Sequence, residues 1–236
     1  MRSLVLVMAA IVALSGCDNV EEEAQGSTPG QAKAAAEENA IRTVDTVDGR
    51  RQESFSAAAT STPAIDELFS MLPSAEDVPS AFVRITEPHS VIAPDGPAGP
   101  PNARILYELP QEPTDVSTIS CFEFFVSRFA SESEAQGAFT QIKDTYTRPV
   151  EGATVTVLPN SEIGDEAIGS TLLSTVWEIG TCGTRPVHAY AAVAFRRGAV
   201  IATVVGFTPK ETPSPELALH MAEVLVARID SVTFRK

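Results

Sequence analysis

Three acidic residues lie close together in one glycine-flanked stretch, NSEIGDEAIGS at residues 160–170: Glu162, Asp165 and Glu166. Carboxylate oxygens are the ligands that Ca²⁺ prefers, so these side chains are a candidate ligand or calcium site if the stretch forms a loop. Their spacing differs from that of an EF-hand, and Gly-Asp pairs are also frequent in ordinary turns. Calcium binding, a role beside a histidine in a hydrolase, and plain turn formation therefore all remain open.

The other reactive side chains are isolated in the sequence. The three histidines, His89, His188 and His220, lie in no H-x-x-x-H or H-E-x-x-H pattern. His220 and Glu223 lie on one expected helix, but two ligands do not make a zinc site, which needs three or four. The chain has no G-x-S-x-G or S-x-x-K nucleophile pattern and no glycine-rich phosphate loop. We therefore expect no metal, no cofactor and no catalytic residue set.

The first residues have the pattern of an export signal. Arg2 precedes an apolar run from Leu4 to Leu14, and this run of about 11 residues is shorter than the roughly 20 that cross a bilayer core. The following Leu14-Ser15-Gly16-Cys17 matches the lipobox of bacterial lipoproteins. That resemblance implies cleavage before Cys17 and acylation of its thiol, and two or more acyl chains hold a protein stably to a membrane. An ordinary signal peptide with a chance cysteine is the alternative.

The residues around the cysteines bear on location and on cross-linking. Asp18 resembles the retention signal of enterobacterial lipoproteins, which favours the inner membrane, with the domain on its periplasmic or extracellular face. If Cys17 carries lipid, Cys121 and Cys182 remain, and an even pair in an oxidising compartment favours a disulfide. Two free buried thiols, a redox pair, and a Cys–His pair with His188 are the alternatives.

Composition divides the chain into three parts. Residues 1–16 are the expected signal peptide. Residues 17–61 contain few large apolar side chains, so we expect a lipidated N-terminus followed by a disordered acidic tether. Residues 62–236 have the length and apolar periodicity of one globular domain. The net charge of −14 opposes binding to phosphate backbones, so we expect no nucleic acid partner.

Hydrophobic patterns predict a mixed fold for that domain. Apolar residues recur at spacings of three and four in the expected helices and alternate in the expected strands. The expected helices cover residues 63–72, 131–147 and 215–230, and the expected strands cover 81–86, 104–109, 119–129, 153–159, 171–179, 187–195 and 199–207. Ser131 and Glu134 predict a capping box, and Gly198 predicts a tight turn between the last two strands. The order predicts an α+β fold, with helices covering at least one face of an antiparallel sheet.

Four segments resemble a module of exported bacterial proteins: MLPSAEDVPSAF, IGDEA, VAFRRGAVIATVVGF and LVARID. They are similar to segments of PsbP-like lipoproteins and of the extracytoplasmic sensor domains of mycobacterial kinases of the PknH type. The resemblance implies an α/β sandwich with an antiparallel sheet, an intramolecular disulfide in some members, and a role in binding a ligand or partner. It carries no catalytic residue over to this chain.

Together these observations favour a non-enzymatic, membrane-tethered binding or sensor domain. The expected partners are the membrane, through the lipid anchor, and an unidentified protein or small molecule. The expected site is a cleft between sheet and helices, edged by the proline- and glycine-rich loop at residues 88–102 and by the loop at residues 160–170. The alternatives are an envelope hydrolase and a scaffold subunit of a membrane complex.

Overall fold

The computed structural model describes residues 65–91, 99–115, 117–159, 162–182 and 185–233. The expectations for the signal peptide, for Cys17 and Asp18, and for the tether lie outside the described residues and stay predictions. No helix within the described ranges is both long enough and apolar enough to cross a membrane.

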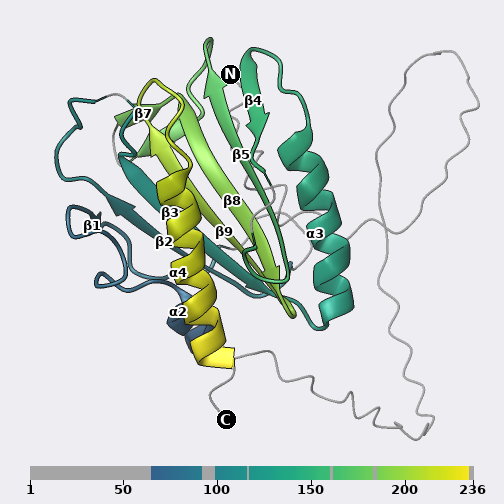
Figure 1. Cartoon of the computed structure of the whole chain (residues 1–236). Coiled ribbons are helices and arrows are strands. Elements are labelled where there is room, and N and C mark those ends of the chain that lie inside the picture. Colours follow the sequence, from purple (N-terminus) through teal and green to yellow (C-terminus); the bar gives the residue numbers. More distant parts are fainter. Residues whose placement is uncertain (1–64, 92–98, 116, 160–161, 183–184, 234–236) are drawn as a thin grey trace, which may run out of the picture. The chain divides into compact units, whose positions relative to one another are not determined.

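The described part of the chain forms three helices and nine strands (Figure 1). The helices are α2 (Ile65–Met71), α3 (Glu132–Thr147) and α4 (Glu216–Thr233). The strands are β1 (Val83–Arg84), β2 (Asn102–Glu108), β3 (Cys121–Arg128), β4 (Ala153–Val157), β5 (Glu166–Ser174), β6 (Gly180–Cys182), β7 (Arg185–Val187), β8 (Ala189–Arg197) and β9 (Val200–Thr208).

Seven strands form one sheet in the order β1-β2-β3-β9-β8-β5-β4, and every neighbouring pair is antiparallel. Strands β6 and β7 form a separate two-stranded ribbon. The sheet and its helices confirm the predicted α+β class. The predicted tight turn joins β8 to β9, and Gly198 in this turn has a φ of 57°, a conformation that residues with a Cβ rarely adopt.

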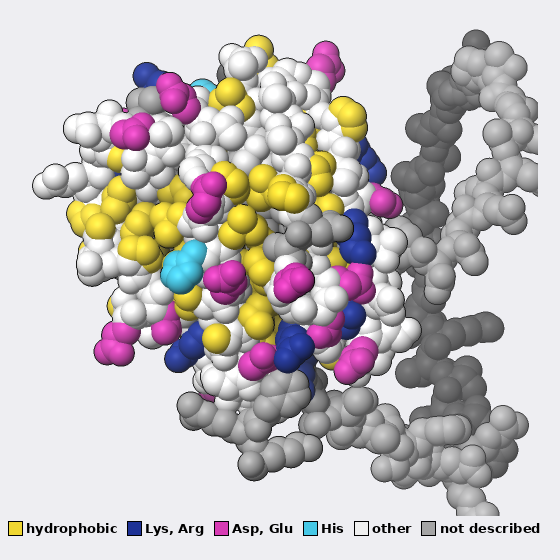
Figure 2. Space-filling model, viewed as in Figure 1, with side chains coloured by type: hydrophobic (Ala, Val, Ile, Leu, Met, Phe, Trp, Pro, Cys, Tyr) yellow, Lys and Arg dark blue, Asp and Glu magenta, His cyan; other side chains and the backbone are white. Residues whose placement is uncertain are grey.

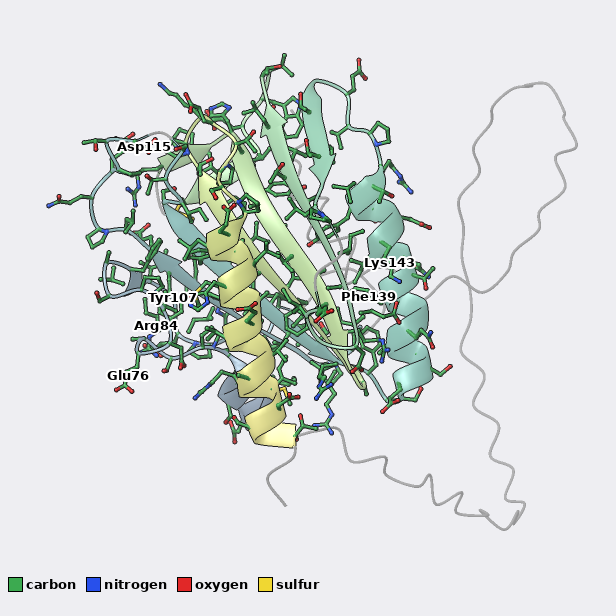
Figure 3. The ribbon with its side chains drawn as sticks, in the orientation of Figure 1. Glu76, Arg84, Tyr107, Asp115, Phe139 and Lys143 are labelled. Carbon is green, nitrogen blue, oxygen red and sulfur yellow. A yellow bond between two sulfur atoms is a disulfide. The ribbon has the colours of Figure 1, made fainter. Side chains whose placement is uncertain are left out.

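Helices α2 and α4 pack on one side of the sheet, which we name the α4-side face. Helix α4 lies across β8 and β9, and α2 lies against α4, β2 and β3 (Figure 1). The Tyr107 hydroxyl, labelled in Figure 3, donates a hydrogen bond to the Pro73 carbonyl at 2.8 Å. The alternate sheet residues that point to this side form the main core: Ala103, Ile105, Tyr107, Phe122, Phe124, Val126, Ala191, Val193, Phe195, Val200, Ala202 and Val204.

The outer surface on this side is mixed in character. In Figure 2, hydrophobic side chains gather across the middle of the view, and charged side chains lie mostly below them. The residues beneath α4 are buried, so the helix closes this side of the sheet in the described part of the chain.

Helix α3 packs on the opposite side of the sheet, which we name the α3-side face. Phe139 and Ile142 of α3 are buried against Ala194 of β8 and Ile201 of β9. The predicted capping box starts this helix. The Ser131 hydroxyl accepts a hydrogen bond from the Glu134 N–H at 3.2 Å, and the Glu134 carboxylate accepts one from the Ala130 N–H at 3.2 Å.

Every predicted strand except β5 begins and ends within two residues of its predicted bounds, and the β6–β7 ribbon was not predicted. Strand β5 covers Glu166–Ser174, so the prediction of a strand over residues 171–179 is wrong at both ends. The Trp177 N–H donates to the Ser174 hydroxyl at 3.1 Å, and this local bond turns the chain out of the sheet. Residues 166–170, predicted as part of a loop, pair with β8 instead. Strand β1 contains only Val83–Arg84.

A disulfide joins Cys121 in β3 to Cys182 in β6, the pairing that the cysteine count favoured. Both residues are fully buried, and they pack with Val187. The cross-link therefore attaches the β6–β7 ribbon to the main sheet.

Candidate ligand-binding face

The carboxylate of Asp165 lies among cations and backbone donors. It accepts a hydrogen bond from the Gly198 N–H at 2.7 Å, from Arg197 at 3.0 Å and from Arg196 at 3.2 Å. Partial burial acts to raise the pKa of Asp165, but the hydrogen bonds and the two positive charges outweigh it and hold the pKa below its usual value. Arg197 also contacts Asp230 of α4 at 2.7 Å. Asp165 therefore joins the start of β5 to the β8–β9 turn and, through Arg197, to α4.

Glu166 is held in the same way, from the side of α3. It accepts hydrogen bonds from Lys143 of α3 and Arg196 of β8, and the Lys143 bond does most to hold the pKa of Glu166 below its usual value. Lys143 lies near Phe139 on α3 (Figure 3), with Nζ 5.3 Å from the ring centroid. Glu162 is exposed. Within the described ranges, no group of three or more His, Cys, Asp or Glu residues is placed to hold a metal ion. Calcium binding here stays a prediction.

In the described part of the chain, the three histidines contact groups other than the acidic residues of the 160–170 segment. The His89 Nδ1 donates to the Glu87 carbonyl at 2.9 Å, and the His188 Nδ1 donates to the Trp177 carbonyl at 3.2 Å. His220 and Glu223 form an exposed pair on α4 with 3.7 Å between Nδ1 and Oε2. Within the described ranges, the hydrogen bonds of these rings therefore do not join a histidine to an acidic residue of the 160–170 segment.

The structure instead brings polar residues together on the α3-side face. Strand register places alternate residues of five strands on this side in three rows. The rows across the sheet are Arg104, Phe125, Thr203, Ala194 and Ile168; then Leu106, Glu123, Val205, Ala192 and Ser170; then Glu108, Cys121, Phe207, Tyr190 and Leu172. The α4-side face has aliphatic and aromatic residues at the equivalent central positions. The α3-side face therefore combines charged, hydroxyl and apolar groups.

A buried carboxylate on β3 and a half-exposed cation on β2 lie at the β2 end of the first two rows. Arg104 Nε is 2.7 Å from Glu123 Oε1, and their side chains are 36% and 7% exposed. Burial raises the pKa of Glu123 and outweighs the opposing effect of Arg104 and the smaller one of His89. The Arg104 Nη nitrogens make no hydrogen bond within the described part of the chain. Arg104 therefore keeps donor atoms available toward solvent.

Two tyrosines from other elements reach the same region. Tyr146 projects from α3 near Thr203, and Tyr190 projects from β8 near Ser170. Burial raises the pKa of both phenols, so both stay neutral hydroxyls at physiological pH and can donate hydrogen bonds. The buried Thr203 and Ser170 oxygens make no hydrogen bond of standard geometry in the described part of the chain, although the phenols are near enough to interact with them.

The β6–β7 ribbon bounds one end of this face. Cys182 of the ribbon is bonded to Cys121, which belongs to the third row. Arg185 of the ribbon donates to the Leu109 carbonyl and lies 3.7 Å from Glu108, also in that row. Disulfide and ion pair thus hold the ribbon at this end of the rows.

The β1 edge of the face is apolar and open. Val83 pairs with Glu108, so it points to this side, and it is 44% exposed. The Ile85 N–H donates to the Leu106 carbonyl at 3.0 Å, and Ile85, two residues after Val83, is 36% exposed on the same side. Apolar surface therefore continues from the polar centre to the edge of the sheet.

Arg104, Glu123 and Tyr146 therefore bring a guanidinium, a carboxyl group and a neutral hydroxyl close together beside apolar side chains. Small-molecule sites use polar groups of these kinds to orient a ligand.

The sequence analysis did not identify these residues. The available signal was Glu123 inside the apolar strand ISCFEFFVSRF, where a charged residue breaks the pattern. His89, from the loop expected at residues 88–102, pairs with Arg104 through backbone hydrogen bonds of 3.1 and 2.9 Å, and the expected cleft between the two loops stays a prediction. Residues 92–98 of that loop lie outside the described residues.

Comparisons with known proteins identify no relative by sequence. No family model matches the chain, and no curated protein matches it. One solved structure is similar, the extracellular domain of PknH from Mycobacterium tuberculosis, with 10% identity and a TM-score of 0.49. The match covers 71% of this chain and 97% of that domain. It is a weak neighbour from one of the two groups that the sequence resembled, and it establishes neither a family nor a function.

Proposed function

We propose that this protein is a non-enzymatic binding domain, anchored to the membrane through lipid on Cys17, and that the α3-side face binds its ligand. The observation that carries the proposal is the Arg104 and Glu123 pair, which lies on the α3-side face beside the smaller of the two hydrophobic clusters that cover the sheet. Burying charged groups costs free energy that an apolar pair would not cost. Stability alone therefore does not account for this composition.

The proposed location outside the cytoplasm is supported by two features. The signal-like segment ends in the lipobox residues Leu14-Ser15-Gly16-Cys17. The disulfide between Cys121 and Cys182 is of the kind that persists in oxidising compartments. Retention at the inner membrane, suggested by Asp18, is part of the same proposal. Intact mass of the membrane-extracted protein should show acyl chains on Cys17, and an unacylated protein would contradict the anchor.

Neither alternative function has equal support. The envelope hydrolase would use Glu162, Asp165 and Glu166 with a histidine, but arginine and lysine side chains contact the Asp165 and Glu166 carboxylates, and the His89 and His188 rings bond to backbone carbonyls. A scaffold role has one observation in its favour, the exposed Val83 and Ile85 at the sheet edge. Such a patch also suits the apolar part of a ligand, so the binding experiment must separate the two.

The experiment measures binding of the neutral apolar fluorophore 1-N-phenylnaphthylamine to the full chain from residue 17, with Cys17→Ser to avoid acyl chains. Cooperative thermal unfolding first confirms that each sample is folded. Ile85→Gln should weaken binding about fivefold, because burying one aliphatic side chain against a ligand contributes about 1 kcal/mol. Ile65→Gln is the matched control, since Ile65 is 38% exposed against 36% for Ile85 and lies on α2, on the opposite side of the sheet.

The results separate the candidates. Loss of fluorophore binding in Ile85→Gln but not in Ile65→Gln supports the α3-side face as the site. Equal effects of the two substitutions, or no binding by the unsubstituted chain, would contradict it. Self-association that Ile85→Gln abolishes, without fluorophore binding, would favour the scaffold role instead.

A further inference from the structure

The polar groups of the α3-side face differ in how many hydrogen-bonding atoms remain available to a ligand. The Glu123 carboxylate is buried and already lies against Arg104. Glu108, on the same face, lies near Arg185. Arg104 uses only its Nε toward Glu123, and its side chain is 36% exposed. A guanidinium has five N–H donors, so Arg104 retains donors that its one close partner does not occupy.

The Tyr146 phenol, close enough to act on Glu123, adds a donor and no negative charge, because it is a neutral hydroxyl whose pKa is raised by burial. Tyr190 lies three strands from β2 in the sheet, on β8. The His89 backbone pairs with that of Arg104, and the His89 charge, when present, is positive and close enough to act on Glu123. The available hydrogen-bonding capacity therefore fits an anionic group.

Apolar side chains continue from Arg104 along the strand direction and toward the sheet edge. Leu106 is the next residue of β2 on this face, and Ile85 and Val83 flank it on the edge side. Same-face residues on a strand are about 6.8 Å apart, so the distance from Arg104 to Glu108 past Leu106 is about 13 Å. A medium-length alkyl chain can cover this distance.

Resting on the proposed function, we propose that the ligand is an amphipathic carboxylate. Its head group contacts the Nη atoms of Arg104, and its apolar body lies over Leu106, Ile85 and Val83. Arginine suits this role because its planar fork binds a carboxylate through two parallel hydrogen bonds. The binding step is non-covalent, so the ligand leaves unchanged.

Because Arg104 contacts both Glu123 and the proposed ligand, ligand binding should depend on the protonation of Glu123. A ligand carboxylate on the Nη atoms of Arg104 offsets part of the positive charge that stabilises the Glu123 anion. Glu123 then takes up a proton more readily, so the ligand binds more tightly as pH falls toward the pKa of Glu123, which burial raises above its usual value. The other groups facing Glu123 are His89, whose protonation also favours an anion, and the Tyr146 phenol, which stays neutral as pH falls.

The test compares three probes with the same ten-carbon chain: decanoate, decanol and decylamine. Each competes with the fluorophore on the full chain from residue 17 carrying Cys17→Ser. Decanoate should bind about tenfold more tightly than decanol at pH 7, because hydrogen bonds to charged groups contribute about 1.5–3 kcal/mol. Decylamine should bind no more tightly than decanol.

Substitutions then locate the head group. Arg104→Gln should remove the advantage of decanoate over decanol and leave decanol binding in place. Because this change leaves Glu123 without its partner, the double variant Arg104→Gln with Glu123→Gln tests the same point with two neutral amides. Arg84→Gln is the matched control, since Arg84 pairs with Tyr107 on the neighbouring strand and so points to the opposite side.

The dependence of decanoate affinity on pH tests whether ligand binding is coupled to the protonation of Glu123. Glu123→Gln should flatten the rise in decanoate affinity as pH is lowered from 8, and His89→Gln is the comparison variant that keeps Glu123. A rise that disappears with His89→Gln and persists with Glu123→Gln would contradict the coupling through Glu123.

The ligand class and the proposed function can fail separately. Equal binding of decanoate and decanol, tightest binding of decylamine, or no displacement by any of the three probes would overturn the ligand class alone. Failure of the fluorophore to distinguish Ile85→Gln from Ile65→Gln would overturn the binding face itself.

Discussion

Asp165→Asn should destabilise the protein and leave it insensitive to calcium. Asp165 accepts hydrogen bonds from the backbone of Gly198 and from Arg196 and Arg197, and Arg197 extends the contact to Asp230. An asparagine keeps one acceptor oxygen but loses the negative charge. The change therefore tests whether this segment is an ion-pair cluster or the calcium loop that its acidic residues first suggested.

The magnitude follows from the exposure of the cluster. The Asp165 side chain is 31% exposed, so each arginine contact contributes about 0.2–1 kcal/mol after screening by solvent. Weakening the bond from Gly198 adds about 0.5 kcal/mol, the low end for a net hydrogen-bond contribution. The free energy of unfolding should fall by about 1–2 kcal/mol. For a domain of this size, the melting temperature should fall by about 2–8 °C.

The assay is thermal unfolding followed by circular dichroism at pH 7, in EDTA and in millimolar Ca²⁺. Asp144→Asn is the control, because Asp144 is exposed on α3 and its carboxylate makes no hydrogen bond within the described ranges. We expect the Asp144 variant to melt with the unsubstituted protein. If Ca²⁺ raises the melting temperature of the unsubstituted protein but not that of Asp165→Asn, the segment binds calcium. If the two variants melt together, the cluster contributes no stability.

The difference in stability between Asp165→Asn and the unsubstituted protein should also depend on pH. The pKa of Asp165 is held below its usual value in the folded protein, so its ionised form contributes stability above the unfolded pKa of about 3.9. That contribution is lost as pH falls through the folded pKa. The gap in melting temperature between the unsubstituted protein and Asp165→Asn should therefore narrow as pH is lowered from 7 toward 3. A gap that widens in acid would refute the assignment to the charge of Asp165.

Three further variants test the structure around the face. Replacing Cys121 and Cys182 together by serine opens a loop with a sequence separation of 61, so urea unfolding should show a loss of about 4 kcal/mol in the chain-entropy model; a loss below about 1 kcal/mol would contradict it. Gly206→Ala should cost about 1–3 kcal/mol, because its Cβ would lie 2.6 Å from Ile119 Cδ1 in the core. Gly137→Ala on the exposed side of α3, where the Cβ meets nothing within 4 Å, should instead stabilise by about 0.5–1 kcal/mol, and the reverse order would be unexpected.

The sequence predicted those features that depend on residues close together in the chain. Alternating apolar residues predicted β8 and β9, and apolar spacing predicted α3 with its Ser131 cap. Such patterns arise because one side of each helix or strand packs into the hydrophobic core and the other side does not. The acidic segment is harder to predict, because the contacts of Arg196 and Arg197 with Asp165 depend on how β5 pairs with β8.

The candidate face could not be predicted for the same reason. Arg104 and Glu123 lie on different strands, and their contact depends on the β2–β3 register, which pairs Leu106 with Glu123 and places Arg104 one row away. Tyr146 comes from a helix, and Tyr190 comes from a strand two positions across the sheet from β3. No local pattern links these residues. Sequence reasoning could note only that Glu123 interrupts an apolar strand.

The two sides of the sheet differ in composition and in how much they contribute to folding. The α4-side face buries aliphatic and aromatic side chains, and this burial supplies the main favourable free energy of folding. A buried ion pair adds little net stability over an apolar pair of similar size, so Arg104 and Glu123 have no comparable role in folding. They share their face with Tyr146 and Tyr190, beside the open apolar edge at Val83. The α3-side face has a smaller core of its own around Phe139 and Ile142, and the polar groups beside that core are the reason that we propose a ligand there.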